Sequence, residues 1–448
     1  MFLNHDIQNE IIRRRDMRDV FTFTIDPADA KDFDDAISFQ TVEEGYQIGV
    51  HIADVSFYVR PGTKVDDDAY QRGTSVYLVD RVLPMLPEEL CNDKCSLRPN
   101  EDKLCMSVIF TMDADAHVLK YKICRTVIRS NARLDYFQAQ EIINPSKTSN
   151  TSHTSHTRNT SALATALTTL NSLATKLRAE RIANGALTIE QDEMRFKLDE
   201  HGYPTEIYFE QPNEAHHLIE EFMLLANKTV AKAVGSGRPF VYRVHDVPDA
   251  EKLEEIKKFK RQCAMTAKMR HHAVSQETID RAINMLTIRA QAKAVYSTYN
   301  IGHYGLAFSH YTHFTSPIRR YPDLMVHRLV EKYILTGKPI SLTREELEEK
   351  CEHCSACEQD ATQAERDSIK QFQALWMKEH VGEILNGHIS GVTDFGFFVQ
   401  LDESRCEGLI HMTTIEHPED YVLGDPVTVQ VVRVDINRAQ IDFEMVQS

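Results

Sequence analysis

The sequence feature that most constrains this chain is a run of acidic residues directly behind a short β-type segment. The run follows the mostly apolar stretch 20–25, spans ten positions and comprises Asp26, Asp29, Asp32, Asp34 and Asp35. Carboxylates this close repel one another and raise one another's pKa unless a cation lies between them. The run therefore indicates either a solvated acidic turn or a site for a hard divalent ion with oxygen ligands.

A calcium loop is the first kind of site to test against this run. Counted from Asp26, the glycine expected at the sixth loop position and the glutamate expected at the twelfth are both missing. The remaining kind of metal site holds magnesium or manganese. In such a site two ions stabilise the attacking and leaving oxygens of a phosphodiester.

A second segment, 313–323, has the features of a helix start. Ser316 followed by Pro317 has the form of an N-cap and first helical residue, although Pro322 would delay the helix.

Two adjacent arginines, Arg319 and Arg320, lie at or just before this helix start. Cations there oppose the helix dipole. An anion between the arginines and the helix end would remove this penalty and accept bidentate hydrogen bonds. The structural alternative is that one arginine pairs with Asp323.

The pattern up to about residue 340 predicts one large mixed α/β domain, 20–340. Short β-type runs alternate with helical periodicity at 162–184 and 214–234. Residues 1–19 are strongly charged and predict an exposed lead-in helix. A segment of Ser, Thr, Asn and His at 144–161 has nothing to bury and predicts a surface loop or disordered insert.

Helical periodicity continues to the end of this domain and beyond it. Residues 257–272 form the basic part of a predicted helix at 250–294, either a solvated face or a wall that contacts phosphates. Residues 341–379 predict a charged helical linker. Its Cys351, Cys354 and Cys357 recur every third residue, which indicates one helical face rather than the paired turn ligands of a zinc site.

From residue 380 to 448, short β-type runs separated by glycines predict a small all-β OB-fold barrel. Phe395, Phe397 and Phe398 lie beside glycines, and at least one of the three must fill the barrel core. Phe395, Phe398 and His411 are predicted to be exposed and to stack on nucleobases.

Composition excludes several classes of protein. No stretch of about 18 uncharged apolar residues occurs, so no membrane-spanning helix is expected. The basic start lacks the apolar run of a secretory signal, and nine cysteines without paired spacing favour reduced thiols, so a cytoplasmic location is expected. The net charge of −16 disfavours a polyanion at long range but is compatible with a basic channel inside an acidic shell.

Several motifs in order resemble the ribonuclease II / ribonuclease R family, with the closer match to ribonuclease R. They are the aspartate run, VHIADV at 50–55, LPMLP at 83–87, CSLRPN at 95–100, YRVHD at 242–246, GHYGL at 302–306 and HFTSPIRRYPD at 313–323. The terminal barrel resembles the RNA-binding OB domain of ribosomal protein S1. The resemblance implies an α/β (mixed α+β) RNB-type catalytic domain followed by this barrel.

The resemblance also implies processive, magnesium-dependent 3′→5′ hydrolysis of single-stranded RNA to nucleoside 5′-monophosphates, by a monomer. The residues that match the family's catalytic and metal-binding aspartates are Asp26, Asp32, Asp34 and Asp35. Arg319 matches the arginine that holds the scissile phosphate.

Five further residues are implied to contact RNA. They are Tyr77, which matches the aromatic clamp; Phe196, its expected stacking partner; Glu221, expected to contact a ribose; Glu365, in a Glu-Arg-Asp motif near the RNA; and Arg320, beside the phosphate-holding arginine.

Two features depart from the family's pattern. Family members usually carry two cold-shock-type domains before the nuclease domain, where this chain has about 20 residues. The polar insert at 144–161 is also unlike the family's charged helical connection. The alternative function, a non-catalytic RNA-binding protein that keeps the nuclease fold, would be favoured by replaced aspartates, but all four are present.

Overall fold

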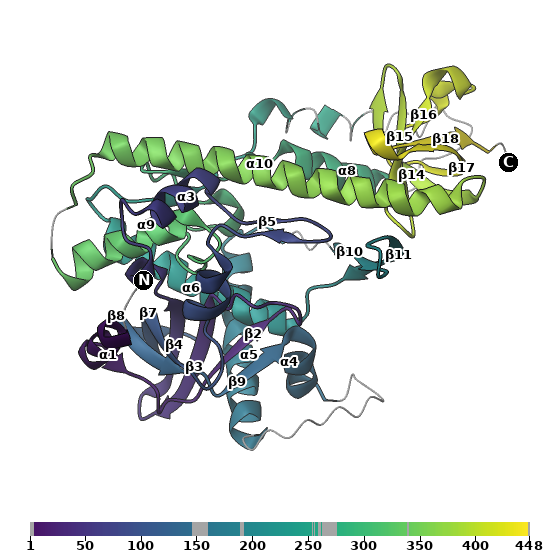
Figure 1. The fold of residues 1–448 in the computed structure, drawn as a ribbon. Coiled ribbons are helices and arrows are strands. Elements are labelled where there is room, and N and C mark those ends of the chain that lie inside the picture. The colour runs from purple at the N-terminus through teal and green to yellow at the C-terminus, as the bar shows by residue number, and fades with distance from the viewer. Residues whose placement is uncertain are drawn as a thin grey trace.

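In the computed structural model the chain forms a large mixed α/β domain and a small β-barrel, joined by one long helix (Figure 1). The structure describes residues 4–145, 160–188, 192–252, 254, 256–258, 261, 276–337 and 340–446. This architecture confirms the predicted fold class. Most of the polar insert and most of the basic stretch 257–272 lie outside the described residues.

The α/β domain is built on a seven-stranded mixed sheet with the order β1-β8-β7-β4-β3-β2-β9. β1 pairs with β8, and β2 with β9, in parallel, and the other neighbours are antiparallel. The strands are β1 (Arg15–Asp16), β2 (Thr22–Asp26), β3 (Asp35–Val42), β4 (Gly45–Ala53), β7 (Asp102–Met112), β8 (Val118–Arg129) and β9 (Ala132–Asp135).

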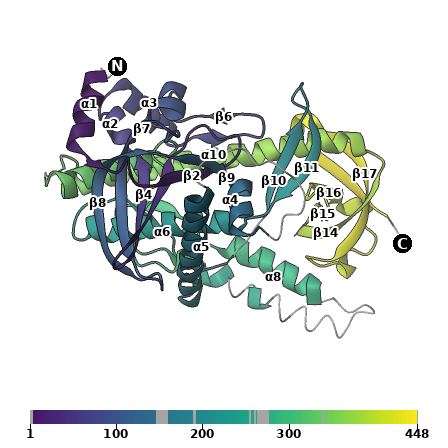
Figure 2. The same ribbon diagram turned by 90° about the horizontal axis from the view of Figure 1, so that it is seen from below.

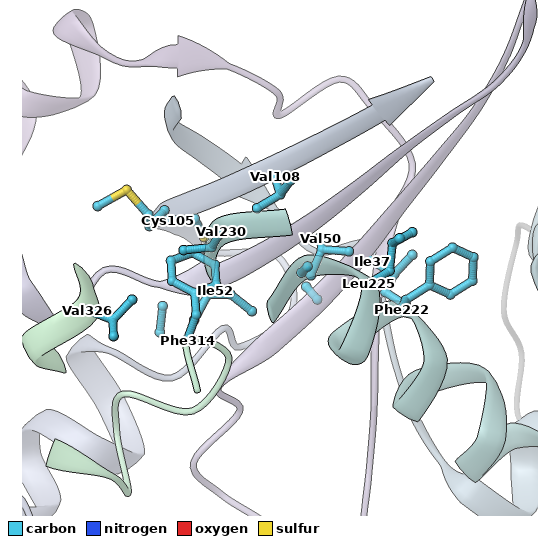
Figure 3. Packing of buried hydrophobic residues seen from close by; sticks show 14 of the residues in the cluster. Ile37, Val50, Ile52, Cys105, Val108, Phe222, Leu225, Val230, Phe314 and Val326 are labelled. Carbon is cyan, nitrogen blue, oxygen red and sulfur yellow. The ribbon is translucent and has the colours of Figure 1, made fainter. Parts of the chain in front are cut away.

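Three helices, α4 (Tyr136–Ile143), α5 (Thr160–Ala183) and α6 (Glu214–Gly235), pack together beside this sheet (Figure 2). Because side chains alternate along a strand, Val50 and Ile52 of β4 point into the core, where they join Leu225 and Val230 of α6 (Figure 3). The intervening His51 is also fully buried, and its ring nitrogens bond hydroxyls of the neighbouring strands.

The remaining helices and strands surround this core or connect it to the barrel. Three small hairpins pair β5 (Val76–Tyr77) with β6 (Val82–Leu83), β10 (Glu193–Leu198) with β11 (Pro204–Glu210), and β12 (Tyr242–Val244) with β13 (Val295–Ser297). The helices are α1 (Asn4–Arg13), α2 (Val55–Tyr58), α3 (Lys64–Arg72), α8 (Gln276–Ala290), α9 (Tyr321–Val330) and α10 (Arg344–Met377). Short 3-10 or π turns are η1 (Glu89–Lys94), η2 (Tyr304–Leu306), η3 (Glu331–Leu335), η4 (Lys378–His380), η5 (Met412–Thr414), η6 (Pro418–Asp420) and η7 (Ile436–Arg438).

The N-terminal segment differs from the predicted exposed helix at 1–19. The helix α1 ends at Arg13, and residues 15–16 then add a strand to the sheet edge. Arg14 between them is buried, and its Nη2 lies 2.7 Å from the buried carboxylate of Asp54. The prediction was wrong here because a charged sequence indicates exposure only when no buried partner of opposite charge is available.

The long helix α10 confirms the predicted helical linker. It begins with a capping box between Thr343 and Glu346 and runs for 34 residues, about 51 Å at 1.5 Å per residue. Figure 1 shows that it crosses the α/β domain and ends at the barrel.

The three cysteines of α10 pack as one helical face. Cys351 and Cys354 are buried in the core of the α/β domain, and Cys357 Sγ lies 3.4 Å from His353 Nε2. Among the described residues, no group of three or more His, Cys, Asp or Glu side chains is arranged to hold a metal ion. Cys351 and Cys354 therefore contribute to core packing.

The terminal domain is a closed five-stranded barrel with the order β14-β15-β16-β18-β17. Its strands are β14 (Ile384–Thr393), β15 (Gly396–Leu401), β16 (Glu407–His411), β17 (Pro426–Asp435) and β18 (Gln440–Met445). Met377 of α10 lies in the barrel core. Trp376 of the same helix and Ile207 of β11 pack against that core. The barrel is therefore tied to the α/β domain by both the long helix and the β10–β11 hairpin.

No described helix combines the length and the apolar character that a membrane crossing requires.

Candidate active site

The aspartates gather at one end of the large sheet. β2 ends at Asp26, β3 begins at Asp35, and the connection between the two strands carries Asp32 and Asp34. Asp34 is only 5% exposed, and its Oδ1 accepts a hydrogen bond of 2.8 Å from the backbone N–H of Ile318. The strand ends thus bring four of the five carboxylates together and leave Asp29 exposed to solvent.

Burial and mutual repulsion shift the titration of these four groups in one direction. Burial raises the pKa of Asp26, Asp32, Asp34 and Asp35 above the ordinary range. The charge of Asp26 raises the pKa of Asp35 further, and the charges of Asp32 and Asp35 raise that of Asp34. The cluster therefore concentrates negative charge that a cation would stabilise.

The donor set of this cluster fits a magnesium or manganese ion that is shared with a substrate. All of its ligand atoms are carboxylate oxygens, and Oδ2 of Asp26 is buried without a hydrogen-bond partner among the described residues. Among the described residues, no three or more of these carboxylates are placed to hold one metal ion together, so the ion would take part of its ligands from outside the protein. Magnesium typically takes one or two carboxylates and completes its octahedron with water and phosphate oxygens, which this arrangement permits.

Arg319 faces the aspartates, with its Nε 3.6 Å from Oδ2 of Asp34. Its side chain is 41% exposed, so the guanidinium has donors left for a further anion. The backbone carbonyl of Arg319 accepts hydrogen bonds from Ser75 N–H and Thr74 Oγ1, which fix the loop.

Arg320 has the structural role that the sequence left open. Its guanidinium forms two hydrogen bonds, of 2.8 and 3.0 Å, with the buried carboxylate of Asp323. The helix begins at Tyr321, with Arg320 as the capping residue, so the expectation that Ser316 caps it was wrong. Pro322 lies in the first turn, the position that proline favours.

Tyr77 lies on the short strand β5 above the same cluster. The residue is 40% exposed. Burial of its hydroxyl raises its pKa, and the charges of Arg319, Asp32 and Asp34 also act on it. The tyrosine therefore presents an accessible ring next to the aspartates. Glu365 of α10 accepts a hydrogen bond of 3.0 Å from the backbone N–H of Tyr77, so the long helix supports this hairpin.

Phe196 lies on β10 and packs against Phe372 of α10, with ring centroids 5.8 Å apart. Phe372 is seven residues beyond Glu365 on the same helix, about 10 Å along its axis. The two predicted stacking residues, Tyr77 and Phe196, thus lie on two separate hairpins, and both hairpins are supported by α10.

The barrel presents its predicted contact residues on the β14–β15 turn and on the neighbouring strands β15 and β16. Phe395 is 57% exposed, His411 is exposed and Phe398 is half-buried, whereas Phe397 fills the core. The rings of Phe395 and Phe398 meet edge to face at 6.0 Å, and His411 lies opposite Gly396 across the β15–β16 pair.

The structure does not place the side chain of Glu221 as a free ribose contact. Glu221 lies in the middle of α6, is 3% exposed and forms a buried ion pair with Arg181 of α5. Its carboxylate oxygens are engaged by the guanidinium of that arginine. Sequence alone could not reveal this pairing because the two residues are 40 positions apart.

Two residues of the site, Tyr136 and His216, escaped the sequence reasoning. Tyr136 follows β9, which runs parallel to β2 and places Asp135 opposite Asp26. Burial raises the pKa of the Tyr136 hydroxyl, and the charges of Asp35 and Asp26 raise it further, so this ring adjoins the aspartates. The ring of Tyr136 stacks on that of His216 at 3.7 Å. The capping box that starts α4, Asp135 to Gln138, was the available sequence signal.

Comparison with known proteins matches both parts of the chain. The RNB domain model matches residues 14–336, which is most of the chain, and the S1 RNA binding domain model matches residues 378–445. This chain belongs to the RNB family. The RNB domain includes the aspartate cluster, Arg319 and Tyr77, and the S1 domain is the terminal barrel.

Relatives of this RNB protein include enzymes named ribonuclease R. That of Aquifex aeolicus is 41% identical over 98% of this chain, and ribonuclease R 2 of Lactococcus lactis is 33% identical over 97%. The chain spans 66% of the first relative's length and 69% of the second's. A structure of Mycoplasma genitalium RNase R with ribose-methylated single-stranded RNA superposes with a TM-score of 0.86 at 27% identity, covering all of this chain and 73% of that one.

Proposed function

We propose that this RNB protein is a processive 3′→5′ exoribonuclease that hydrolyses single-stranded RNA to nucleoside 5′-monophosphates with magnesium or manganese. The observation that carries the proposal is the meeting of four aspartates, of which Asp34 is buried and the other three are half-buried, with one available arginine, Arg319, whose Nε lies 3.6 Å from Asp34 Oδ2. This spacing leaves a place for a phosphodiester between two positive groups. One is a cation held by the carboxylates, and the other is the guanidinium of Arg319. The relatives named ribonuclease R support the same reaction.

The protein's own groups have distinct roles in this mechanism. Asp26, Asp32, Asp34 and Asp35 would hold the metal, which when bound activates water and stabilises the leaving oxygen. Arg319 neutralises charge that builds on the scissile phosphate. The hydrogen bond from Ile318 N–H to Asp34 fixes the segment that carries Arg319 against the β2–β3 connection that carries the aspartates.

Stacking residues would guide the strand toward this site. Tyr77 and Phe196 hold the terminal bases, while Phe395, Phe398 and His411 of the barrel hold bases further upstream. Base stacking is sequence-tolerant, which suits a nuclease that releases nucleotides in succession. The RNA-bound M. genitalium relative supports single-stranded RNA as the ligand.

A digest of uniformly labelled single-stranded RNA tests the proposal, with and without a chelator and beside a DNA strand of the same sequence. The expected products with magnesium are mononucleotides, with no cleavage in chelator or of DNA. Asp34→Asn should stop nucleotide release while RNA binding stays near normal, since an asparagine oxygen still accepts the Ile318 hydrogen bond. Asp29→Asn, in the same loop but exposed, is the matched control and should cleave normally.

The outcomes separate the alternatives. Internal cuts that leave long products would indicate an endonuclease. RNA binding without any metal-dependent release would support the non-catalytic alternative. Near-normal hydrolysis by Asp34→Asn would refute the assigned role of the aspartate cluster.

A further inference from the structure

A cavity of about 760 Å³ lies at the end of the sheet remote from the aspartates. Its walls are the start of β8, the last turns of α5, the second half of α6 and residues 307–310. Its volume falls within the roughly 300–1,000 Å³ of small-molecule sites. Figure 2 shows these helices beside β8.

Two independent measures place this cavity far from the aspartate cluster. Along the sheet, Asp35 lies seven residues, or roughly 23 Å, from Val42 at the other end of β3, where Glu44 of the β3–β4 turn pairs with Lys120 of the cavity wall. The cavity residue Lys228 lies 14 positions beyond Glu214 on α6, or about 21 Å along the helix axis. Glu214 is two residues before His216, whose ring stacks on Tyr136 beside the aspartates. The cavity is therefore a separate site.

The charged groups of the cavity leave an excess of positive charge. The buried pair of Arg181 and Glu221 forms part of its wall, and Lys120 is paired with Glu44. Lys228 and Lys232, one turn apart on α6, both line the cavity. No carboxylate of the described residues lies within ion-pair distance of either one. In a chain of net charge −16, two unpaired lysines facing one cavity favour an anionic ligand.

Aromatic rings adjoin these lysines. Nζ of Lys228 lies 5.3 Å from the centroid of the Phe308 ring, and Tyr121 on β8, which is 48% exposed, also lines the cavity. A flat ring system can stack on such surfaces. Glu180 also lines the cavity and would repel a second phosphate, which disfavours a polymer strand.

We propose that this cavity binds a mononucleotide, with its phosphate monoester at Lys228 and Lys232 and its base against the aromatic wall. A phosphate monoester carries a charge of about −1.5 to −2 at neutral pH, which two lysines balance, whereas an internal phosphodiester carries only one. The site does not depend on the proposed nuclease function, because none of its residues belongs to the aspartate cluster.

Calorimetric titration of the full chain with AMP, in a chelating buffer that suppresses metal-dependent binding, tests this proposal. The double variant Lys228→Gln/Lys232→Gln should weaken AMP binding at least tenfold. Lys122→Gln is the matched control, since this exposed residue follows the cavity strand residues on β8 but does not line the cavity, and it should bind AMP as the parent does. Adenosine should bind at least tenfold more weakly than AMP, because it lacks the phosphate.

Three results would overturn the proposal. Unchanged AMP affinity in the double variant Lys228→Gln/Lys232→Gln would exclude the lysines as the phosphate site. Inorganic phosphate binding as tightly as AMP would exclude the aromatic contact. Displacement of AMP by an RNA oligonucleotide without terminal phosphates would identify a strand-binding surface instead. Melting curves of each variant, which should match the parent's, exclude misfolding as the cause of lost binding.

Discussion

Replacing Asp54 with asparagine tests how the N-terminal segment is attached to the RNB domain. The Asp54 carboxylate is fully buried and caps α2. It accepts hydrogen bonds from Arg14 Nη2 at 2.7 Å, Ser56 Oγ at 2.5 Å and Phe57 N–H at 3.2 Å. Burial alone would raise the pKa of Asp54, but the charges of Arg14 and Arg125 and the Ser56 hydrogen bond hold it well below its usual range.

The magnitude follows from what asparagine keeps and what it loses. Its amide oxygen can still accept the bonds of Ser56 and Phe57, whereas its NH2 group faces the donors of Arg14. Breaking one side of a buried ion pair costs about 3–5 kcal/mol. Because Glu10 also lies 3.0 Å from Arg14 Nη2, the arginine keeps one carboxylate, and we expect the lower end, about 3 kcal/mol.

Thermal melting followed by circular dichroism measures this loss. At about 2–4 °C per kcal/mol, Asp54→Asn should lower the melting temperature of the RNB domain by roughly 6–12 °C. The control Asp102→Asn removes a partly exposed partner of two arginines and should cost at most about 1 kcal/mol. A shift for Asp54→Asn no larger than that of this control would refute the reasoning.

The difference in the free energy of unfolding between the parent protein and Asp54→Asn should depend on pH. A carboxylate whose pKa is lowered in the folded state contributes its full stability at pH values above its pKa in the unfolded state, near 3.8. That contribution disappears as the pH falls toward its pKa in the folded state. The difference between parent and variant should therefore be constant from pH 5 to 7 and narrow below about pH 4.

Three further predictions concern the site and the barrel. Asp323→Asn removes the buried carboxylate that holds Arg320 and should destabilise the nuclease domain by about 3–5 kcal/mol in a denaturant titration, and an unaltered midpoint would contradict the pairing. Phe397→Ala should destabilise the barrel by about 3–5 kcal/mol, measured by the fluorescence of the single tryptophan during unfolding. Phe395→Ala should leave the stability of the barrel unchanged and weaken single-stranded RNA binding by about 1–3 kcal/mol. Equal effects of the two substitutions would contradict the assignment of Phe397 as buried and Phe395 as exposed. Burial lowers the pKa of His216 to about 4, so its NMR signals should not titrate between pH 5.5 and 8, and a midpoint near 6.5 would show an exposed ring.

Much of the fold could be predicted from sequence because it depends on local periodicity. The helix expected at 214–234 is α6, Glu214–Gly235, and the helix expected at 162–184 is α5, Thr160–Ala183. The aspartate cluster was predictable for a similar reason, since its members lie within ten positions and two adjacent strand ends must bring them together.

The misjudged residues share a different property. Arg14 and Glu221 are charged and were expected to face solvent or RNA, yet each is buried against a partner 40 positions away. Tyr136 went unnoticed because its place beside Asp26 depends on the parallel pairing of β9 with β2, two strands more than 100 residues apart. None of these contacts leaves a repeating pattern in the chain.

The sequence by itself determined the order of domains, the periods of their helices and strands, and the concentration of carboxylates after β2. The tertiary structure alone decided that Arg319 faces the cluster while Arg320 is held by Asp323, and that Glu221 pairs with Arg181. The physical reason is that periodicity is set by neighbours three or four positions apart, whereas the pairing of a buried charge depends on which distant side chain the packed elements bring within about 3 Å.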